Sequence, residues 1–265
     1  MADKVRLGGM ALRNGLLVHG PTSWAVAARR ADGTIGVASG RKPKLGGDAI
    51  GAVPGARGVA RLAEAMLVLP LAKRGLPEAR LPWQDARVVG AVTAATLGGA
   101  LLRRRTRGPA GEAAIAALSF LPSVVALRGG DLAAYHGVEH KAIAAYEQDR
   151  DDARDAAKEH DRCGSHLMAP MLASNIAGTA LLKRVVEKPG PVAGGAVALA
   201  SVGIAVEVFA WAERHDRSPL TRVLRAPGHE LQRALGTREP TEEQLEVGRA
   251  ALAEILRAEG ASAAA

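Results

Sequence analysis

The feature that most constrains this 265-residue chain is a set of four uncharged, apolar runs. Each run is 15 or 16 residues long and rich in glycine or alanine, and they cover residues 88–102, 113–127, 167–182 and 192–206. A helix that crosses a bilayer needs about 20 apolar residues, with a usable range of about 17–25. The runs are therefore short for membrane spans, and buried helices of a soluble protein are the alternative interpretation.

Residues at and within the runs favour the membrane interpretation. Basic side chains stand at the ends of two runs, at 103–105 and 183–184, where long side chains can reach the polar surface of a bilayer. Glycines suited to close helix contact in lipid occur in three runs: Gly98, Gly99, Gly178, Gly194 and Gly195. We therefore expect a mainly α-helical fold with four short transmembrane helices and a small N-terminal β-hairpin unit.

An even number of spans places both ends of the chain on one side of the membrane. The segment 128–166 would lie on that same side, which carries far more lysine and arginine than the two short loops opposite. Basic residues accumulate on the cytoplasmic side of bacterial membranes. We expect a multipass protein of the cell membrane with both termini cytoplasmic, whose main partner is the lipid bilayer; self-association into a homo-oligomer stays open.

Charge and composition narrow the range of partners and compartments. The net charge is +8, which suits either nucleic acid or basic flanks of membrane segments. Aromatic residues make up only 3% of the chain, so stacking platforms for nucleic-acid bases are scarce and a nucleic-acid partner is disfavoured. The single cysteine, Cys163, excludes a disulfide within the chain and suits a reducing compartment.

The sequence divides into four predicted parts. Residues 1–50 form a small β unit, in which Asp32-Gly33 marks a hairpin turn between 26–30 and 34–39. Residues 51–86 form an amphipathic helix and a connector. Residues 87–213 form the four-helix membrane bundle, with the polar segment 128–166 inserted in it. Residues 214–265 form a basic segment and a helix that begins with a capping box at Thr241.

The polar segment contains a histidine cluster typical of metal sites. His136, Glu139 and His140 are spaced i, i+3 and i+4, so on a helix they share one face. Two imidazoles one turn apart can bind one zinc-like ion, with the glutamate as a third ligand or as a base. The pattern H-x-x-E-H also occurs in inverted zincins. The alternative interpretation is a helix with surface salt bridges to Lys141.

A second group of ligand types follows within 30 residues. His160, Cys163 and His166 lie within seven residues of one another. Imidazole and thiolate together suit zinc or iron. We predict that His136, His140, His160 and Cys163 bind a divalent metal, most simply zinc with iron as the alternative, and that Glu139 is the catalytic base.

Four further residues are candidates for the site. Glu147 follows the cluster and could complete the coordination. Glu207 ends the last apolar run, and a carboxylate at membrane depth is costly and usually functional. Arg162 and Arg238 could hold an anionic substrate.

The chain also resembles a known family, the bacterial YqhQ-like proteins, over most of its length. The resemblance rests on motifs spread along the chain: Gly8-Gly9, Gly20-Pro21, Gly55-x-Arg57-Gly58, Tyr135 to Lys141, Tyr146-Glu147, His160 to Ser165, Pro227-Gly228 and Thr237 to Pro240, with Glu207 after the last apolar run. The resemblance implies a multipass membrane protein that is a metal-dependent enzyme of unassigned reaction.

Three functions follow as expectations, of which one, a basic soluble protein that contacts nucleic acid, is disfavoured by the scarcity of aromatic residues; the other two place the chain in the membrane. The first is a metal-dependent membrane enzyme, for instance a hydrolase, with a His/Glu/Cys site on the cytoplasmic face. The second is a non-enzymatic membrane scaffold or assembly factor whose metal is structural. An open coordination position would favour the enzyme, and a closed shell of four protein ligands would favour the scaffold.

Overall fold

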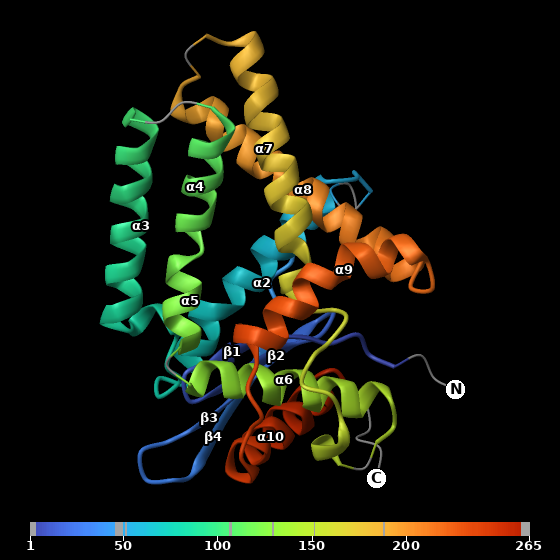
Figure 1. The fold of residues 1–265 in the computed structure, drawn as a ribbon. Coiled ribbons are helices and arrows are strands. Elements are labelled where there is room, and N and C mark those ends of the chain that lie inside the picture. Colours follow the sequence, from blue (N-terminus) through green and yellow to red (C-terminus); the bar gives the residue numbers. More distant parts are fainter. Residues whose placement is uncertain are drawn as a thin grey trace. The chain divides into compact units, whose positions relative to one another are not determined.

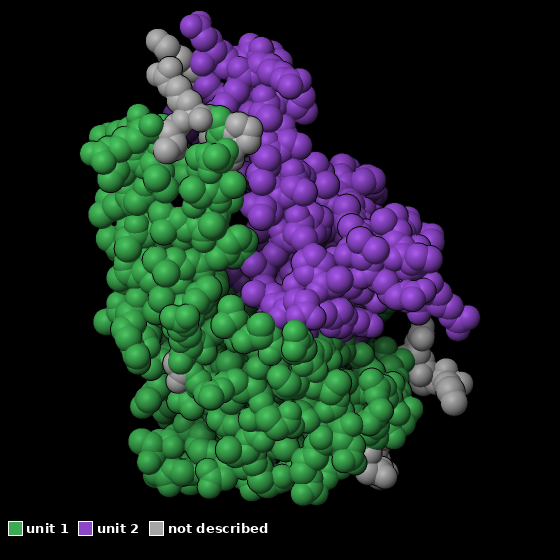
Figure 2. All heavy atoms as spheres, in the orientation of Figure 1, with its two compact units in different colours: residues 1–43, 67–160, 233–265 green, residues 44–66, 161–232 purple. Residues whose placement is uncertain are grey.

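The computed structural model describes residues 4–45, 50, 52–105, 108–128, 130–150, 152–187 and 189–260. The chain forms two compact units, coloured separately in Figure 2. Unit 1 contains residues 1–43, 67–160 and 233–265, and unit 2 contains residues 44–66 and 161–232. The division falls within one helix, α2 (Ala56–Gly75).

Unit 1 is built on a four-stranded antiparallel sheet. Its strands are β1 (Gly8–Leu12), β2 (Gly15–His19), β3 (Ser23–Arg29) and β4 (Ile35–Arg41), paired in chain order. The predicted hairpin is confirmed as β3–β4, with Gly33 at a φ of 85° in its turn. Strands β1 and β2 were not predicted; the two-residue turn Arg13-Asn14 joins them, and Leu12 pairs with Gly15.

Both faces of this sheet are covered, because its strands are apolar on both sides. Helices α6 (Asp131–Glu147) and α10 (Glu242–Ala258) pack on one face, against residues that include Leu16, Val18 and Ala25. The C-terminal half of α2 covers the other face, against Leu17 and the alternate residues of β3. This arrangement is visible in Figure 1 and follows from the two-residue period of a strand.

The four apolar runs are all helical. In unit 1 the first two form α3 (Ala86–Arg105), α4 (Pro109–Ser119) and α5 (Leu121–Arg128), which pack together as a helical hairpin. In unit 2 the other two form α7 (Met168–Val185) and α8 (Pro191–Arg214), followed by α9 (Pro219–Leu231). Four short 3-10 or π segments complete the described chain: Pro82–Gln84, Ala153–Asp155, Gly164–Leu167 and Gln232–Gly236.

The prediction of four membrane-spanning helices is wrong for the described residues. Among the described helices, only α8 is by itself long and apolar enough to cross a bilayer. One further pair of segments, 113–128 and 131–147, reaches that length and hydropathy only when the two are taken together, and they are bent by 85° relative to each other. The second run is broken between α4 and α5, so neither piece spans a bilayer. Helices α3 and α7 have enough residues, but glycine, threonine, serine and terminal basic residues lower their mean hydropathy.

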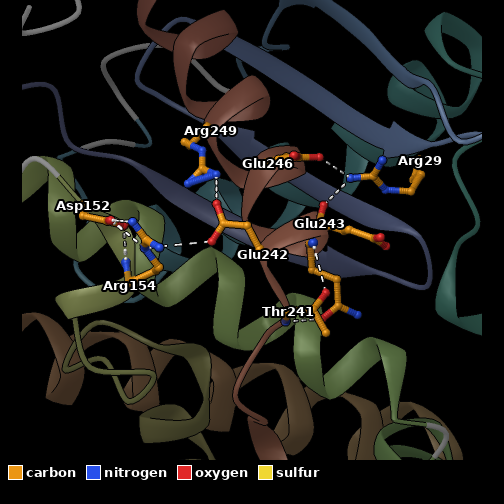
Figure 3. Close-up of polar contacts among 9 residues, drawn as sticks. Arg29, Asp152, Arg154, Thr241, Glu242, Glu243, Glu246 and Arg249 are labelled. Atoms are coloured by element: carbon orange, nitrogen blue, oxygen red, sulfur yellow. Dashed lines mark hydrogen bonds and ion pairs between the residues drawn. The ribbon is translucent and has the colours of Figure 1, made fainter.

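The helix capping box at Thr241 is confirmed. The Thr241 hydroxyl accepts from the Gln244 amide, and the Gln244 side chain accepts from the Thr241 amide. Figure 3 shows how ion pairs hold the start of α10: Glu242 contacts Arg249 and lies 3.9 Å from Arg154. On the other side, Arg29 of β3 binds Glu246 at 2.9 Å.

Close packing of α10 on α6 leads to a first prediction. A Cβ at Gly248 would lie 2.5 Å from Cγ1 of Val138, which is fully buried and stiff. We expect Gly248→Ala to lower the free energy of unfolding by about 1–3 kcal/mol. Gly90→Ala on α3 is the matched control, because no atom of the described residues lies within 4 Å of its Cβ, and it should stabilise by about 0.5–1 kcal/mol.

Denaturant unfolding followed by circular dichroism in mild detergent measures both variants. Equal stability of Gly248→Ala and the wild-type protein would contradict this contact.

Candidate metal centre

The predicted cluster His136/His140 lies on α6, where the two rings are neighbours. Their centroids are 4.3 Å apart, and their ligand atoms lie within 4.8 Å of each other. Nitrogen ligands of one tetrahedral zinc ion lie about 3.3 Å apart, given Zn–N bonds of about 2.0–2.1 Å. Small side-chain rotations therefore suffice for both imidazoles to bind one ion.

His136 is oriented by a distant segment of unit 1. Its Nδ1 donates to the carbonyl of Gly236 at 2.8 Å. That segment crosses α6 directly over Gly137, where a Cβ would lie 2.3 Å from the Arg238 carbonyl oxygen. The Arg238 amide also donates to the Ala133 carbonyl at 2.9 Å. Glycine within the His-Gly-Val-Glu-His sequence is therefore required for the crossing that brings the Gly236 carbonyl to His136.

His140 is oriented by a second segment. It is buried, and its Nδ1 donates to the carbonyl of Lys158 at 2.6 Å. The loop that carries Lys158 is bound by the next residue of α6 after His140.

That residue is Lys141, which is only 3% exposed. Its Nζ donates to the carbonyls of Arg154 at 3.0 Å and Ala156 at 2.8 Å, and it lies 2.6 Å from Oε1 of Glu239. A single ammonium group thus binds both segments that supply carbonyls to the histidines. The alternative interpretation of the cluster, in which Lys141 forms salt bridges at the surface, is therefore wrong about the position of Lys141.

A third imidazole belongs to the same region of unit 1. His160 lies 5.7 Å from His140 between ring centroids, and its Nε2 is 3.3 Å from Oε2 of Glu147. Unit 1 therefore brings together four of the residues that the sequence predicted: His136, His140, His160 and Glu147.

The hydrogen bonds define which nitrogen of each ring is suited to bind a metal. Carbonyl and carboxylate oxygens only accept, so the nitrogen facing each oxygen carries the hydrogen. The opposite nitrogen of a neutral ring then carries the lone pair. Metal-binding histidines nearly always have this arrangement, with one N–H donated to a carbonyl or carboxylate.

Glu139 lies on another side of α6, against the sheet. It is 8% exposed, and its carboxylate would lie 2.8 Å from a Cβ placed on Gly9 of β1. Gly9 therefore makes room for this buried carboxylate. No observation tests its predicted role as a base, and the role stays a prediction.

Each of the other predicted residues has contacts within its own unit. Cys163 belongs to unit 2, where burial raises the pKa of its thiol and the Ser165 amide donates to its sulfur. Arg162 lies 4.0 Å from Glu213, Glu207 binds Arg57, and the exposed Arg238 lies beside Gly130. Their proposed roles stay predictions.

His166, the remaining histidine of this sequence region, is built into unit 2. It is buried, its Nδ1 donates to the Arg225 carbonyl at 3.1 Å, and Gln232 lies 3.2 Å from its Nε2. Helix α9 approaches it so closely that a Cβ at Gly228 would lie 2.2 Å from the ring. These contacts support a structural role for His166.

Sequence comparison places this region within a described family. A family model for a protein of unknown function, DUF1385, matches residues 118–258, just over half of the chain. The match includes α6 and the segment that crosses it at Gly137. Comparisons with curated proteins and with solved structures give no match.

The buried position of Lys141 leads to a second prediction. Lys141→Met would leave the Arg154 and Ala156 carbonyls without their donor, and we expect the free energy of unfolding to fall by roughly 2–4 kcal/mol. Lys73→Met is the matched control: Lys73 also donates to two carbonyls, of Pro77 and Ala79, but is partly exposed.

The control should change stability by less than about 1 kcal/mol. Chemical denaturation of both variants in parallel measures the difference. Equal losses of unfolding free energy in the two variants would show that the Lys141 contacts stabilise the protein no more than those of the partly exposed Lys73.

Proposed function

We propose that this chain, which belongs to the DUF1385 family of proteins of unknown function, is a membrane-associated, metal-dependent enzyme with its metal site on helix α6. The metal ligands would be His136 and His140 together with either Cys163 or His160, which leaves one coordination position open. The proposed reaction class is hydrolysis.

The observation that carries this proposal is the orientation of three neighbouring imidazoles. Each has one ring nitrogen hydrogen-bonded to an oxygen atom. His136 donates to the Gly236 carbonyl, His140 to the Lys158 carbonyl and His160 to the Glu147 carboxylate. Three such anchors on adjacent rings match the supporting hydrogen bonds of metal-binding histidines, including the carboxylate–histidine–metal arrangement.

The donor set suits zinc, with iron as the alternative. Imidazole nitrogens bind both ions, and a thiolate would shift the preference toward softer metals. Cys163 follows His160 by three residues, which span at most about 11 Å. The covalent chain therefore keeps the thiol within reach of a site that contains His160.

A catalytic role requires an open coordination position. Bound zinc or iron would supply a Lewis acid for a carbonyl or phosphoryl substrate. Glu139 would be the base, because it lies one turn from His136 on the same helix; its carboxylate faces Gly9 of β1 and would have to turn toward the metal. Arg162 and Arg238 remain the candidates for binding an anionic substrate.

A structural metal in a non-enzymatic scaffold is the second candidate function. Its specific support is burial, because His140 is 2% exposed and Cys163 is 9% exposed. Structural zinc sites are closed by four protein ligands, commonly including cysteine.

Membrane association is supported by apolar side chains on the surface of each unit. In unit 1, α3 exposes Val89, Val92, Leu97 and Leu101. In unit 2, α7 and α8 expose Leu181, Val185, Val192, Leu199 and Ile204. Many large apolar side chains exposed on the same helices suggest contact with a membrane or another protein. Helix α8 has 24 residues and is about 36 Å long, enough to cross a hydrocarbon core.

Metal analysis provides the third prediction. We expect purified wild-type protein to contain about one zinc or iron per chain. His136→Ala and His140→Ala should each lose most of the bound metal, because each variant lacks one imidazole ligand. The backbone carbonyl that accepts a hydrogen bond from that imidazole cannot take its place as a ligand. His215→Ala is the control, because this exposed histidine bonds locally to Trp211 on α8. Full metal retention in both α6 variants would refute the site.

Cobalt substitution then separates the enzyme from the scaffold. A thiolate-to-cobalt absorption band that disappears in Cys163→Ser would show that Cys163 is a ligand in either case. A spectrum that does not respond to added azide would indicate a closed shell of four protein ligands and favour the scaffold, whereas a spectrum that responds to azide would indicate an open position and favour the enzyme.

Membrane partitioning provides the fourth prediction. Wild-type protein should remain in the membrane fraction after an alkaline carbonate wash. Ala198→Arg places a charge on the exposed surface near the middle of α8, at a cost of about 2.5–3.5 kcal/mol in a membrane. We expect it to reduce the retained fraction severalfold, whereas Val37→Arg on β4 should not. Complete release of the wild-type protein would contradict membrane insertion.

A further inference from the structure

Unit 2 contains an apolar groove that the metal site does not use. Its volume is about 940 Å³, near the upper end of the roughly 300–1,000 Å³ of typical ligand pockets. The N-terminal half of α2 and one side of α8 form its walls, together with residues that precede α2. Its lining includes Gly55, Ala60, Ala200, Gly203, Glu207 and Val208.

Two close contacts hold the walls together. A Cβ at Gly58 would lie 2.5 Å from Cγ1 of Val206, and a Cβ at Gly203 would lie 3.3 Å from the backbone of Gly55. The helices therefore touch at glycines on one side of the groove. Small residues such as Ala60 and Ala200 leave the remaining space open.

The groove has one polar end. Oε1 of Glu207 accepts from the Gly55 amide and from Arg57 Nε, both at 2.8 Å, and Oε2 accepts from Arg57 Nη2 at 2.5 Å. The Arg57 side chain is 30% exposed and that of Glu207 is 26% exposed. This end therefore presents a positive and a negative group side by side, with no net charge.

The other lining residues of α8 are apolar. From Ala196 to Val208 the helix rises about 18 Å, and Glu207 is the only charged residue among the described residues that line the groove. A long apolar wall with one neutral ion pair at its end matches an amphiphile that has an apolar chain and a headgroup carrying both charges.

We propose that this groove binds an acyl chain of a zwitterionic phospholipid, with the headgroup at the Arg57–Glu207 pair. The phosphate would face Arg57 and the ammonium would face Glu207. The proposal rests on the membrane association proposed above, because α8 is the helix that meets the length and composition of a membrane span. It is independent of the metal site.

Native mass spectrometry of detergent-purified full-length protein tests this proposal. The probes are phosphatidylethanolamine, which is zwitterionic, and phosphatidylglycerol, which is anionic, added separately and together. We expect one phosphatidylethanolamine per chain and a preference for it over phosphatidylglycerol. Because the protein is in detergent, this measurement of lipid binding does not depend on the outcome of the carbonate wash that tests membrane association. Failure of one proposal can therefore be distinguished from failure of the other.

Three variants locate the bound lipid. Ala200→Phe and Ala60→Phe fill the groove from opposite walls, and each should reduce the bound fraction at least tenfold. Ala198→Phe adds the same ring to the exposed surface of α8 outside the lining, and it should bind lipid like the wild type. Circular dichroism of each variant shows whether it is folded. If only one of Ala200→Phe and Ala60→Phe folds, that variant alone is enough to test whether the lipid lies in the groove.

Glu207→Gln tests the charge argument. It keeps a hydrogen-bond acceptor but leaves Arg57 uncompensated, so the preference should move toward phosphatidylglycerol. The proposal is overturned if wild-type protein retains no lipid, if folded Ala200→Phe or Ala60→Phe retains as much as Ala198→Phe, or if the wild type prefers phosphatidylglycerol.

Discussion

The buried ammonium group of Lys141 is the interaction on which the organisation of the candidate site depends. It binds two carbonyls of the 153–156 segment and the carboxylate of Glu239. An ammonium group loses much hydration on burial, so it persists only where acceptors replace the lost water. Here the acceptors come from two segments that are far apart in sequence. Those same segments supply the Lys158 and Gly236 carbonyls that orient the two histidines of α6.

Glycines make the other close approaches in unit 1 possible. Gly137 lets the Arg238 backbone cross α6, Gly9 leaves space for the Glu139 side chain, and Gly248 lets α10 pack on Val138. A methyl group at any of these positions would lie within 2.8 Å of another atom. Helix α6 is thus surrounded on several sides by elements that approach it at small residues. Protein interiors are closely packed, so these contacts fix the position of the α6 backbone that carries the imidazoles.

Much of the local structure could be predicted from sequence. The four apolar runs are helical, Asp32-Gly33 forms a hairpin turn, and Thr241 starts a capped helix. Local patterns suffice here because helices and turns depend on residues close in sequence. The predicted number of membrane spans was wrong because the glycines and basic residues that suggested lipid contact also lower the mean hydropathy of α3 and α7. Pro122, in the first turn of α5, is the sequence signal for the break after Phe120. Strands β1 and β2 were not predicted, because the residues of the turn between them, Arg13-Asn14, are not a typical hairpin pair.

For the histidine cluster, the sequence by itself determined that His136 and His140 share one face of a helix, since the spacing of four residues matches the helical repeat. It also placed His160, Glu147 and Cys163 nearby along the chain. Only the tertiary structure decided which ring nitrogen of each histidine is anchored, because the acceptors at His136 and His140 are backbone carbonyls, and every residue type has one. The burial of Lys141 and the orientation of Glu139 toward the sheet are likewise seen only in the tertiary structure. Burial depends on which distant segments pack around a helix, and no local pattern encodes that choice.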